Sequence, residues 1–370
     1  MIIKHKNSKI VNNNLYNKFY YYSVSNTSLN NNFLNDLCKK FPKENTKKIY
    51  FTELLLLTNS DNSEYILNWL HYHINVIKID HIVIIDNSLT QINNQYESIK
   101  QRFKDKVEIH RITDSVNQAE IYTKFVNNSQ SEYVFPIDDD EYIFISDKFK
   151  NNLNLFIKNL EISTPGFFKY SFNWHMMFAS KINENYDNNF IINNTNTLIK
   201  NIKQNTNFVE GYNFIKCIVN TKIWHFYLGE GNDKIHIPFN NISLLNINLQ
   251  KPLFNKLKDV NYDCLGTVHN PISYDKNSLH HSFNFESNEI NIGFFNYTDS
   301  LSLNTDACLY HFKYRSFNEW MYKIKNFKLN NISNYYFQNV YNENRFYNVY
   351  NYALNNTVTD DRISKLYSSQ

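Results

Sequence analysis

The chain has 370 residues, with 38 Lys or Arg against 35 Asp or Glu, which gives a formal net charge of +3. So small a charge argues against a general nucleic-acid or membrane-surface binder. Hydrophobic residues make up 42% of the chain and aromatic residues 16%. This composition excludes a disordered chain and indicates a globular protein with a large core.

The four cysteines, Cys38, Cys217, Cys264 and Cys308, are widely spaced and form no Cys-x-x-Cys pair. Their spacing indicates neither a zinc site nor a disulfide framework. The first residues lack the apolar core of a signal peptide, and no apolar run approaches the roughly 20 residues of a membrane-spanning helix. We therefore expect a soluble cytoplasmic protein without a transmembrane segment, or one attached to a membrane through a partner.

Residues 1–48 are polar and rich in Asn and Lys, with some helix expected around 29–41. From residue 49 onward, short apolar runs alternate with segments of helical periodicity. The predicted strands are 49–57, 81–85, 107–112 and 132–137, and the predicted helices between them are 63–77, 93–104 and 117–127. This alternation predicts an α/β fold with a mostly parallel central sheet flanked by helices.

After residue 145 the alternation weakens, and the predicted elements become shorter. We expect helices over 147–160 and through Trp320, and strands at 167–172, 214–219, 222–228 and 264–269. The Asn-rich stretch 182–208 is predicted to be a loop, and the tail from residue 331 is predicted to be helical in part.

The strongest local signal is the run Asp138-Asp139-Asp140-Glu141, which directly follows the apolar strand 132–137. Carboxylates at the end of a buried strand repel one another unless a cation lies between them. In an extended chain Asp138 and Asp140 point to the same side, so we expect this pair to hold one Mg²⁺ or Mn²⁺ ion. The alternative is a solvated acidic turn.

Other polar residues also stand at the ends of predicted strands. Asp86 is a candidate for recognising the ribose or base of a nucleoside, or else an ordinary turn aspartate. His269 and His311 each end a short apolar stretch, and each is a candidate ligand of the ion or the diphosphate, or else a structural histidine. His73 lies on the apolar stripe of helix 63–77, so we expect it to be buried and hydrogen-bonded.

In their order along the chain, these segments resemble the glycosyltransferase family 2 superfamily, specifically its family 92-like branch. The resemblance covers roughly residues 49–327, and the family's Asn-Glu pair and second Glu are replaced by Asp61-Asn62 and Asn68. The positions that carry it are Tyr65, Trp69, Tyr72 and His73 in the first helix, Asp86-Asn87-Ser88, Gln118, Asp138 to Tyr142, and His311 to Ser316 with Glu319, Trp320 and Lys323 after them.

The resemblance implies a GT-A type nucleotide-diphospho-sugar transferase fold. It divides the chain into an N-terminal extension (1–48), a nucleotide-sugar-binding half (49–145), an acceptor-binding half (146–330) and a C-terminal helical tail (331–370). It implies a metal-dependent glycosyltransferase with a UDP-linked nucleotide-sugar donor, Mn²⁺ or Mg²⁺ as cofactor, and a glycan, lipid or protein as acceptor.

Together with the strand-end positions above, the resemblance leads to expected roles for single residues. The donor is expected to contact Thr58, Asn62, Asp86, Gln118 and His311, and the metal is expected on Asp138, Asp140 and His269. Inversion at the anomeric carbon needs one carboxylate base on the acceptor hydroxyl, for which Asp233, Glu230 and Asp263 are the candidates.

Two other functions stay open from the sequence. A catalytically inactive protein that binds carbohydrate or nucleotide is suggested by Asn62, which stands where the family has Glu. A nucleotidyltransferase is the second alternative, but residues 58–62 contain none of the glycines expected of a phosphate-binding loop after the first strand.

Overall fold

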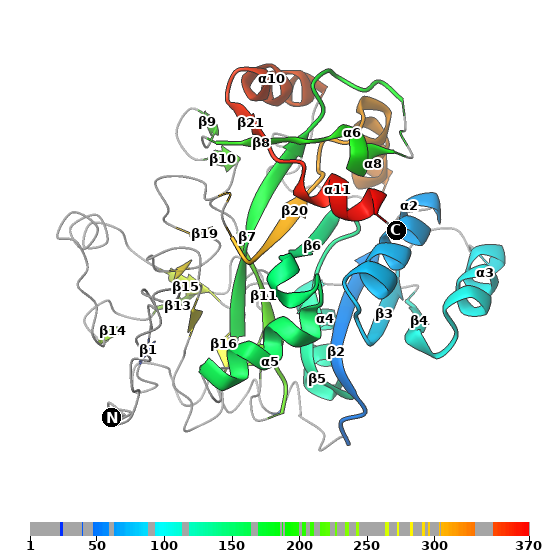
Figure 1. The fold of residues 1–370 in the computed structure, drawn as a ribbon, viewed down its shortest axis with the longest axis vertical. Coiled ribbons are helices and arrows are strands. Elements are labelled where there is room, and N and C mark those ends of the chain that lie inside the picture. Colours follow the sequence, from blue (N-terminus) through cyan, green and yellow to red (C-terminus); the bar gives the residue numbers. More distant parts are fainter. Residues whose placement is uncertain are drawn as a thin grey trace.

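A computed structural model of the chain shows a mixed α/β architecture in which one large sheet lies between layers of helices (Figure 1). The structure describes residues 23–24, 39, 47–58, 63–87, 93–112, 118–163, 169–185, 187, 189–199, 202–204, 208–210, 215–222, 226–227, 234–236, 242–243, 263–265, 272–273, 282–283, 291–292, 295–296, 303, 305–329 and 343–369.

The helices and strands of the first half follow the predicted order. They are β1 (Ser23–Val24), β2 (Tyr50–Thr58), α2 (Ser63–His71), the π-helix η2 (Tyr72–Val76), β3 (His81–Asp86), α3 (Asn93–Phe103), the 3-10 helix η3 (Lys104–Lys106), β4 (Val107–Arg111), α4 (Gln118–Asn128), β5 (Ser131–Pro136) and β6 (Glu141–Ile145).

The second half consists mostly of short strands, with helices near its two ends. Its elements are η4 (Asp147–Phe149), α5 (Leu153–Ser163), β7 (Lys169–Phe178), α6 (Phe190–Asn193), β8 (Asn196–Leu198), β9 (Ile202–Gln204), β10 (Phe208–Glu210), β11 (Ile215–Asn220), β12 (Phe226–Tyr227), β13 (Lys234–His236), β14 (Ile242–Ser243), β15 (Asp263–Leu265), β16 (Ile272–Ser273), β17 (Ser282–Phe283), β18 (Asn291–Ile292), β19 (Phe295–Asn296), β20 (Ala307–His311), α8 (Phe317–Leu329), α10 (Glu343–Leu354), β21 (Thr357–Thr359) and α11 (Arg362–Ser368).

The large sheet has a parallel part and a mixed part. Its strand order is β21-β8-β7-β11-β5-β2-β3-β4, and the four strands from β5 to β4 all run parallel. β11 joins β5 to β7 through antiparallel pairs, while β20 lies parallel to β7 and antiparallel to β6. The predicted α/β fold with a parallel central sheet is confirmed, and the antiparallel pairs belong to the second half.

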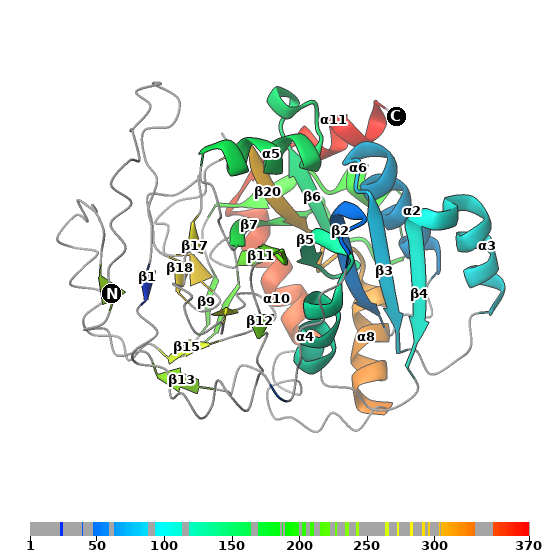
Figure 2. The same ribbon diagram turned by 90° about the horizontal axis from the view of Figure 1, so that it is seen from below.

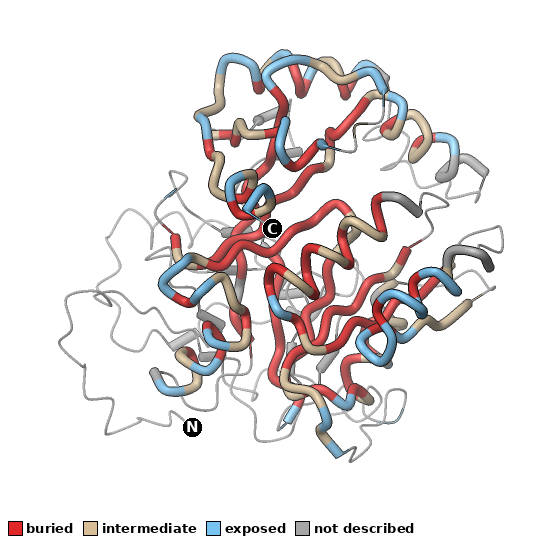
Figure 3. The backbone as a smooth tube through the Cα atoms, turned by 45° about the vertical axis from the view of Figure 1, so that its right-hand side comes forward, coloured by how far each residue is buried: buried red, intermediate tan, exposed pale blue. Residues whose placement is uncertain are grey.

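Alternate residues of the parallel strands pack on opposite faces, as the two-residue period of a strand requires. Leu54, Leu56, Ile82 and Ile84 face the large core that also contains side chains of α2, α3 and α5. Leu55, Val83, Ile85 and Val134 face a smaller core with Tyr122 and Val126 of α4. Figure 2 shows α4 and α5 on opposite sides of the sheet, and Figure 3 shows buried backbone running through the central strands.

This arrangement creates a switch point in the sheet. The connections through α2 and α3 lie on one face, and the connection through α4 to β5 lies on the other. From β2, the chain adds β3 and β4 on one side of the sheet and β5 on the other, so the strand order reverses between the parallel neighbours β2 and β5. In open α/β sheets, ligands bind beyond the carboxyl ends of the strands at such a point.

Several local predictions need correction. Residues 141–145 form the strand β6, which the sequence analysis did not predict, and the helix expected over 147–160 begins only at Leu153, after a 3-10 turn. Strand β7 continues six residues further than expected, through its buried second half to Phe178. The stretch 182–208 is not only a loop, because it contains α6, β8, β9 and β10.

The tail does contain the expected helices, α10 and α11, but it also adds β21 to the edge of the sheet through β8. The helix expected around 29–41 lies outside the described residues. In the described part of the chain, no helix combines the length and the apolar character needed to cross a bilayer. The division into a donor half and an acceptor half stays a prediction.

Candidate active site

The four acidic residues lie in a tight turn at the carboxyl end of β5, beside the switch point. We call residues 137–141 the aspartate turn. The Glu141 amide donates to the Asp138 carbonyl at 3.1 Å, and the Asp138 amide donates to Glu141 Oε2 at 2.7 Å. The expectation of an extended chain with Asp138 and Asp140 on one side is therefore wrong, because the turn breaks the strand alternation.

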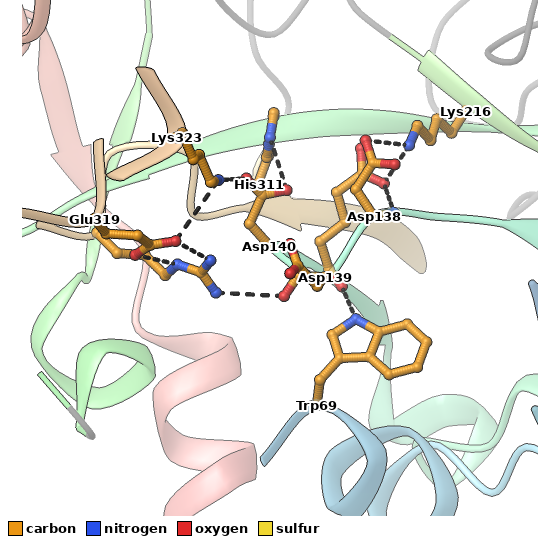
Figure 4. Close-up of polar contacts among 10 residues, drawn as sticks. Trp69, Asp138, Asp139, Asp140, Lys216, His311, Glu319 and Lys323 are labelled. Carbon is orange, nitrogen blue, oxygen red and sulfur yellow. Dashed lines mark hydrogen bonds and ion pairs between the residues drawn. The ribbon is translucent and has the colours of Figure 1, made fainter. Parts of the chain in front are cut away.

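As a result, Asp138 and Asp140 point toward different partners and not to one common side as predicted (Figure 4). Asp138 Oδ2 and Glu141 Oε2 both lie 2.7 Å from the ammonium group of Lys216 on β11. Asp140 instead points to His311 and Lys323, with its Oδ1 3.3 Å from His311 Nε2 and its Oδ2 2.8 Å from Lys323 Nζ. Asp138 and Asp140 therefore have different partners in this structure.

Strand pairing brings His311 to Asp140 across 171 sequence positions. β20 pairs with β6 so that His311 stands opposite Glu141, and the Phe312 amide donates to the Asp140 carbonyl at 2.8 Å. The Trp174 ring packs against the imidazole, with ring centroids 4.2 Å apart. Of the two histidines proposed for the ion or the diphosphate, His311 is thus placed at the aspartate turn, whereas His269 lies outside the described residues.

The first-helix motif supports the backbone of β6. Trp69 Nε1 donates to the Glu141 carbonyl at 2.9 Å, and the Tyr72 hydroxyl donates to the Ile143 carbonyl at 2.7 Å. His73 Nε2 accepts from the Ile143 amide at 3.3 Å, while its Nδ1 lies 2.9 Å from the Trp69 carbonyl. The prediction of a buried, hydrogen-bonded His73 is confirmed, and burial lowers its pKa to about 3.

The ends of β2 and β3 hold two of the predicted donor-binding residues. Thr58 stands opposite Asp86 in the strand register, and both are buried. Asp86 forms an ion pair with Arg111 at the end of β4, a residue that the sequence analysis missed. Because β3 is two strands from β5, Asp86 and the aspartate turn are separated by about 10 Å along the sheet edge, twice the usual strand spacing.

Gln118 begins α4 and hydrogen-bonds the side chain of Tyr122 one turn later. The Tyr122 hydroxyl also accepts a hydrogen bond from the Leu57 amide at 3.1 Å, next to Thr58. Gln118 therefore lies on the face of the sheet that α4 covers, next to Tyr122, whose hydroxyl contacts the carboxyl end of β2. Asn62, Glu230 and Asp233 lie outside the described residues, and for Asp263 only its backbone in β15 is described.

Negative charge exceeds positive charge at the aspartate turn. Five carboxyl groups face three cationic groups, and because Glu141, whose pKa is about 8, is protonated near pH 7, one negative charge remains in excess if His311 is neutral. The carboxyl groups are Asp138, Asp139, Asp140, Glu141 and Glu319, and the cations are Lys216, Arg315 and Lys323. Burial lowers the pKa of His311, although Asp140 opposes this effect, so its imidazole is neutral near pH 7.

Burial also shifts the pKa values of the carboxyl groups in the aspartate turn. Burial raises the pKa of Asp139 to about 6 and that of Glu141 to about 8. For Glu141, the ammonium group of Lys216 opposes the effect of burial, but Glu141 shares that group with the Asp138 carboxylate, which itself raises the Glu141 pKa. Burial alone would also raise the pKa of Asp140, but Lys323 and His311 hold it well below its usual range. Asp140 is therefore the carboxylate that stays ionised most firmly.

These residues fit a divalent cation that arrives with a diphosphate. Asp140 and His311 would supply a hard oxygen ligand and an imidazole nitrogen, and both suit Mn²⁺. The His311 Nδ1 and Glu141 Oε1 atoms are buried and have no hydrogen-bond partner among the residues that the structure describes. Within the described residues no three His, Cys, Asp or Glu side chains form a metal cluster, but ions of this kind use only one or two carboxylates when phosphates and water complete the shell.

Two residues at this site carried no functional assignment from the sequence. Lys216 interrupts the apolar strand Ile215–Asn220, and a buried lysine needs an acidic partner, which is the one signal that could have pointed to it. Lys323 was noted only as part of the final motif. In the structure its ammonium group lies 3.6 Å from Glu319 Oε1, one helical turn earlier, and 2.8 Å from Asp140 Oδ2.

Comparisons with known proteins add little. No protein-family model and no curated protein matches this chain. Among solved structures it is similar to 4-diphosphocytidyl-2C-methyl-D-erythritolsynthase from Anaerococcus prevotii DSM 20548, with 13% identity over 47% of this chain and 71% of that chain and a TM-score of 0.26. Two structures of S. aureus TarS are similar as well, one of residues 1-349 (17% identity, 46% of this chain, 47% of that chain, TM-score 0.27) and one longer (15%, 34%, 21%, 0.25).

The chain thus spans less than half of either TarS structure. TM-scores near 0.26 carry no argument about fold or activity. The function must therefore be argued from the site itself.

Proposed function

We propose that this chain is a metal-dependent glycosyltransferase that moves a sugar from a UDP-linked nucleotide-diphospho-sugar to a hydroxyl of a glycan, lipid or protein, with inversion. The observation that carries the proposal is the aspartate turn at the switch point of a parallel sheet, with His311 brought onto Asp140 by the β6–β20 pair. A Mn²⁺ or Mg²⁺ ion bound there would neutralise the diphosphate that leaves.

The nucleoside and the diphosphate of the donor would bind at two different places along the sheet edge. Asp86, held by Arg111, would accept hydrogen bonds from the nucleoside hydroxyls or base, with Thr58 and Gln118 near it. Asp140 and His311 would lie at the diphosphate end, about two strand spacings away. His269 and Asp138 stay predicted metal ligands, Asn62 stays a predicted donor contact, and Glu230, Asp233 and Asp263 stay the candidates for the base.

A donor cannot bind to this cluster by simple ion pairing. With Glu141 protonated, the acidic and basic groups at the aspartate turn carry one negative charge in excess, and a nucleoside diphosphate brings at least two more. Repulsion at this distance would cost several kcal/mol in a partly buried site. Binding therefore requires additional positive charge from a divalent cation, which is the physical reason for proposing metal dependence.

The proposal is tested by incubating the protein with a panel of nucleotide-sugars and Mn²⁺ and measuring the release of nucleoside diphosphate. Turnover with one donor that disappears on chelation supports it. Binding of a donor without any turnover would indicate an inactive carbohydrate- or nucleotide-binding protein instead. A parallel assay with nucleoside triphosphates and sugar phosphates measures pyrophosphate release, and activity there alone would indicate a nucleotidyltransferase.

A further inference from the structure

The basic side chains at the aspartate turn differ in how far a ligand can reach them. The side chain of Lys216 is 1% exposed and that of Arg315 is also 1% exposed, whereas that of Lys323 is 25% exposed. Arg315 is further fixed by hydrogen bonds to Glu319 and by stacking over the Tyr65 ring, whose centroid lies 3.9 Å from its Cζ. Lys323 is thus the cation of this cluster that an anion from solvent meets first.

The position of Lys323 depends mainly on Asp140. Its ammonium group lies 2.8 Å from Asp140 Oδ2 but 3.6 Å from Glu319 Oε1, too far for a hydrogen bond. Glu319 already accepts hydrogen bonds from Nε and Nη2 of Arg315. If Asp140 gave its oxygens to a divalent cation, Lys323 would lose its close partner among the described residues, and the cation would also repel the ammonium group.

We propose that Lys323 then binds the diphosphate of the donor, exchanging the Asp140 carboxylate for phosphate oxygens. This inference rests on the proposed function and deepens it. A lysine suits such an exchange, because its charge is compact and sits on a flexible stem that can turn without moving helix α8.

The test uses inorganic pyrophosphate with Mg²⁺ as the probe, so that no knowledge of the sugar or base is needed. Titration calorimetry measures the affinity for Mg²⁺ alone and for pyrophosphate in the presence of Mg²⁺. We expect Lys323→Gln to weaken pyrophosphate binding about tenfold or more, the value of one charge-assisted contact. Mg²⁺ binding alone should stay equal or become tighter, because an ammonium group no longer competes for Asp140.

The matched control is Lys325→Gln, which removes an exposed lysine two residues further along α8 and should leave both affinities unchanged. Equal affinities of wild type and Lys323→Gln for pyrophosphate would overturn the inference while leaving the proposed function intact. Parallel loss of Mg²⁺ and pyrophosphate binding would also overturn it, because Lys323 would then only position Asp140. A wild-type protein that binds neither pyrophosphate nor any nucleoside diphosphate would contradict the proposed function itself.

A second measurement does not depend on the stability of Lys323→Gln. In wild-type protein with ¹³C-methylated lysines, the Lys323 resonance is assigned by its absence in Lys323→Arg. Addition of Mg²⁺ and pyrophosphate should shift this resonance and leave that of Lys325 in place. An unmoved Lys323 resonance at saturating pyrophosphate would contradict the exchange of partners.

Discussion

The partners of the carboxylates in the aspartate turn come from three different elements. Lys216 comes from β11, His311 from β20 and Lys323 from α8. The carbonyl groups of the turn are held as well, by Trp69 on Glu141 and Arg315 on Asp139. At the scale of single residues, the turn is therefore fixed in place before any ligand arrives, which is what a site for a charged ligand requires.

Substitution of Asp140 should weaken ligand binding without unfolding the protein. Asp140→Asn keeps the size of the side chain but removes the charge that would hold a cation together with His311. We expect Mn²⁺-dependent binding of nucleoside diphosphate to fall at least tenfold, the value of a lost charge-assisted contact. Calorimetry with UDP and Mn²⁺ measures this, and Asp147→Asn, an exposed position six residues beyond the aspartate turn's Glu141, is the control. Unchanged UDP affinity in Asp140→Asn would contradict the site.

Glu141 should make the metal-free protein more stable at mildly acidic pH. Its pKa is about 8 in the folded protein, mainly because of burial, against about 4.3 in an unfolded chain. The stability that the protonated form contributes is complete below pH 4.3 and is lost as the pH rises through 8. Urea unfolding at pH 6 to 9 should therefore show a falling free energy of unfolding in wild type.

The substitution Glu141→Gln removes the titrating group and should flatten this dependence on pH. The control is Glu97→Gln on the exposed face of α3, which should keep the slope of the wild type. The same slope in Glu141→Gln as in wild type would assign the pH dependence to other groups.

At the scale of elements, the first half could be predicted because each segment has its own periodicity. The runs at Leu54–Leu57 and Ile82–Ile85 are continuously apolar, as expected of strands covered on both faces, and both belong to β2 and β3. β6, which begins at the buried Glu141, was not predicted. The burial of Glu141 depends on Lys216, which lies 75 positions away, and no local pattern contains that contact.

The same limit applies to the candidate site. The sequence placed Asp86, Asp138, Asp140 and His311 at strand ends, and these positions are where the structure has them. It could not supply the partners, because the Asp86–Arg111 pair follows from strand register and the Asp140–Lys323 pair from the packing of α8. The direction of each carboxylate therefore required the three-dimensional structure.

Helix α2 and the π-helix η2 act on the site through the backbone of β6. The Tyr72 hydroxyl is buried and donates to the Ile143 carbonyl. Tyr72→Phe leaves the ring in place but deprives this buried carbonyl of its donor, which should lower the free energy of unfolding by about 1–3 kcal/mol. Urea unfolding measures the change. The control is Tyr96→Phe, which deletes a buried hydroxyl without a hydrogen-bond partner in the described part of the chain and should be close to neutral. An equally small effect at Tyr72 would contradict the role of Tyr72 in supporting β6.

At the scale of the whole molecule, the end of the chain belongs to the same folded unit as the sheet. β21 pairs with β8, which pairs with β7, and β7 in turn pairs with the β20 strand that carries His311. The following residue, Asp360, is buried between His175 of β7 and Tyr310 of β20. The tail therefore forms the edge of the sheet on the side of the second half. Changes in the tail should affect the stability of β20 and thus the position of His311.

Asp360 is the residue through which this dependence can be measured. Its carboxylate accepts hydrogen bonds from Tyr310 Oη at 2.9 Å and from Nε and Nη2 of Arg362 at 2.8 and 2.7 Å. Asp360→Asn leaves the arginine without its counter-charge, and loss of one partner of a buried pair costs about 3–5 kcal/mol. Because Arg362 is partly exposed, we expect the lower end of that range. Asp361→Asn, which affects only the exposed pair with Lys365, should cost less than about 1 kcal/mol. Thermal and urea unfolding of the two variants measure the difference; equal stabilities would mean that the tail is an attachment and not part of the fold that holds β20 and His311 in place.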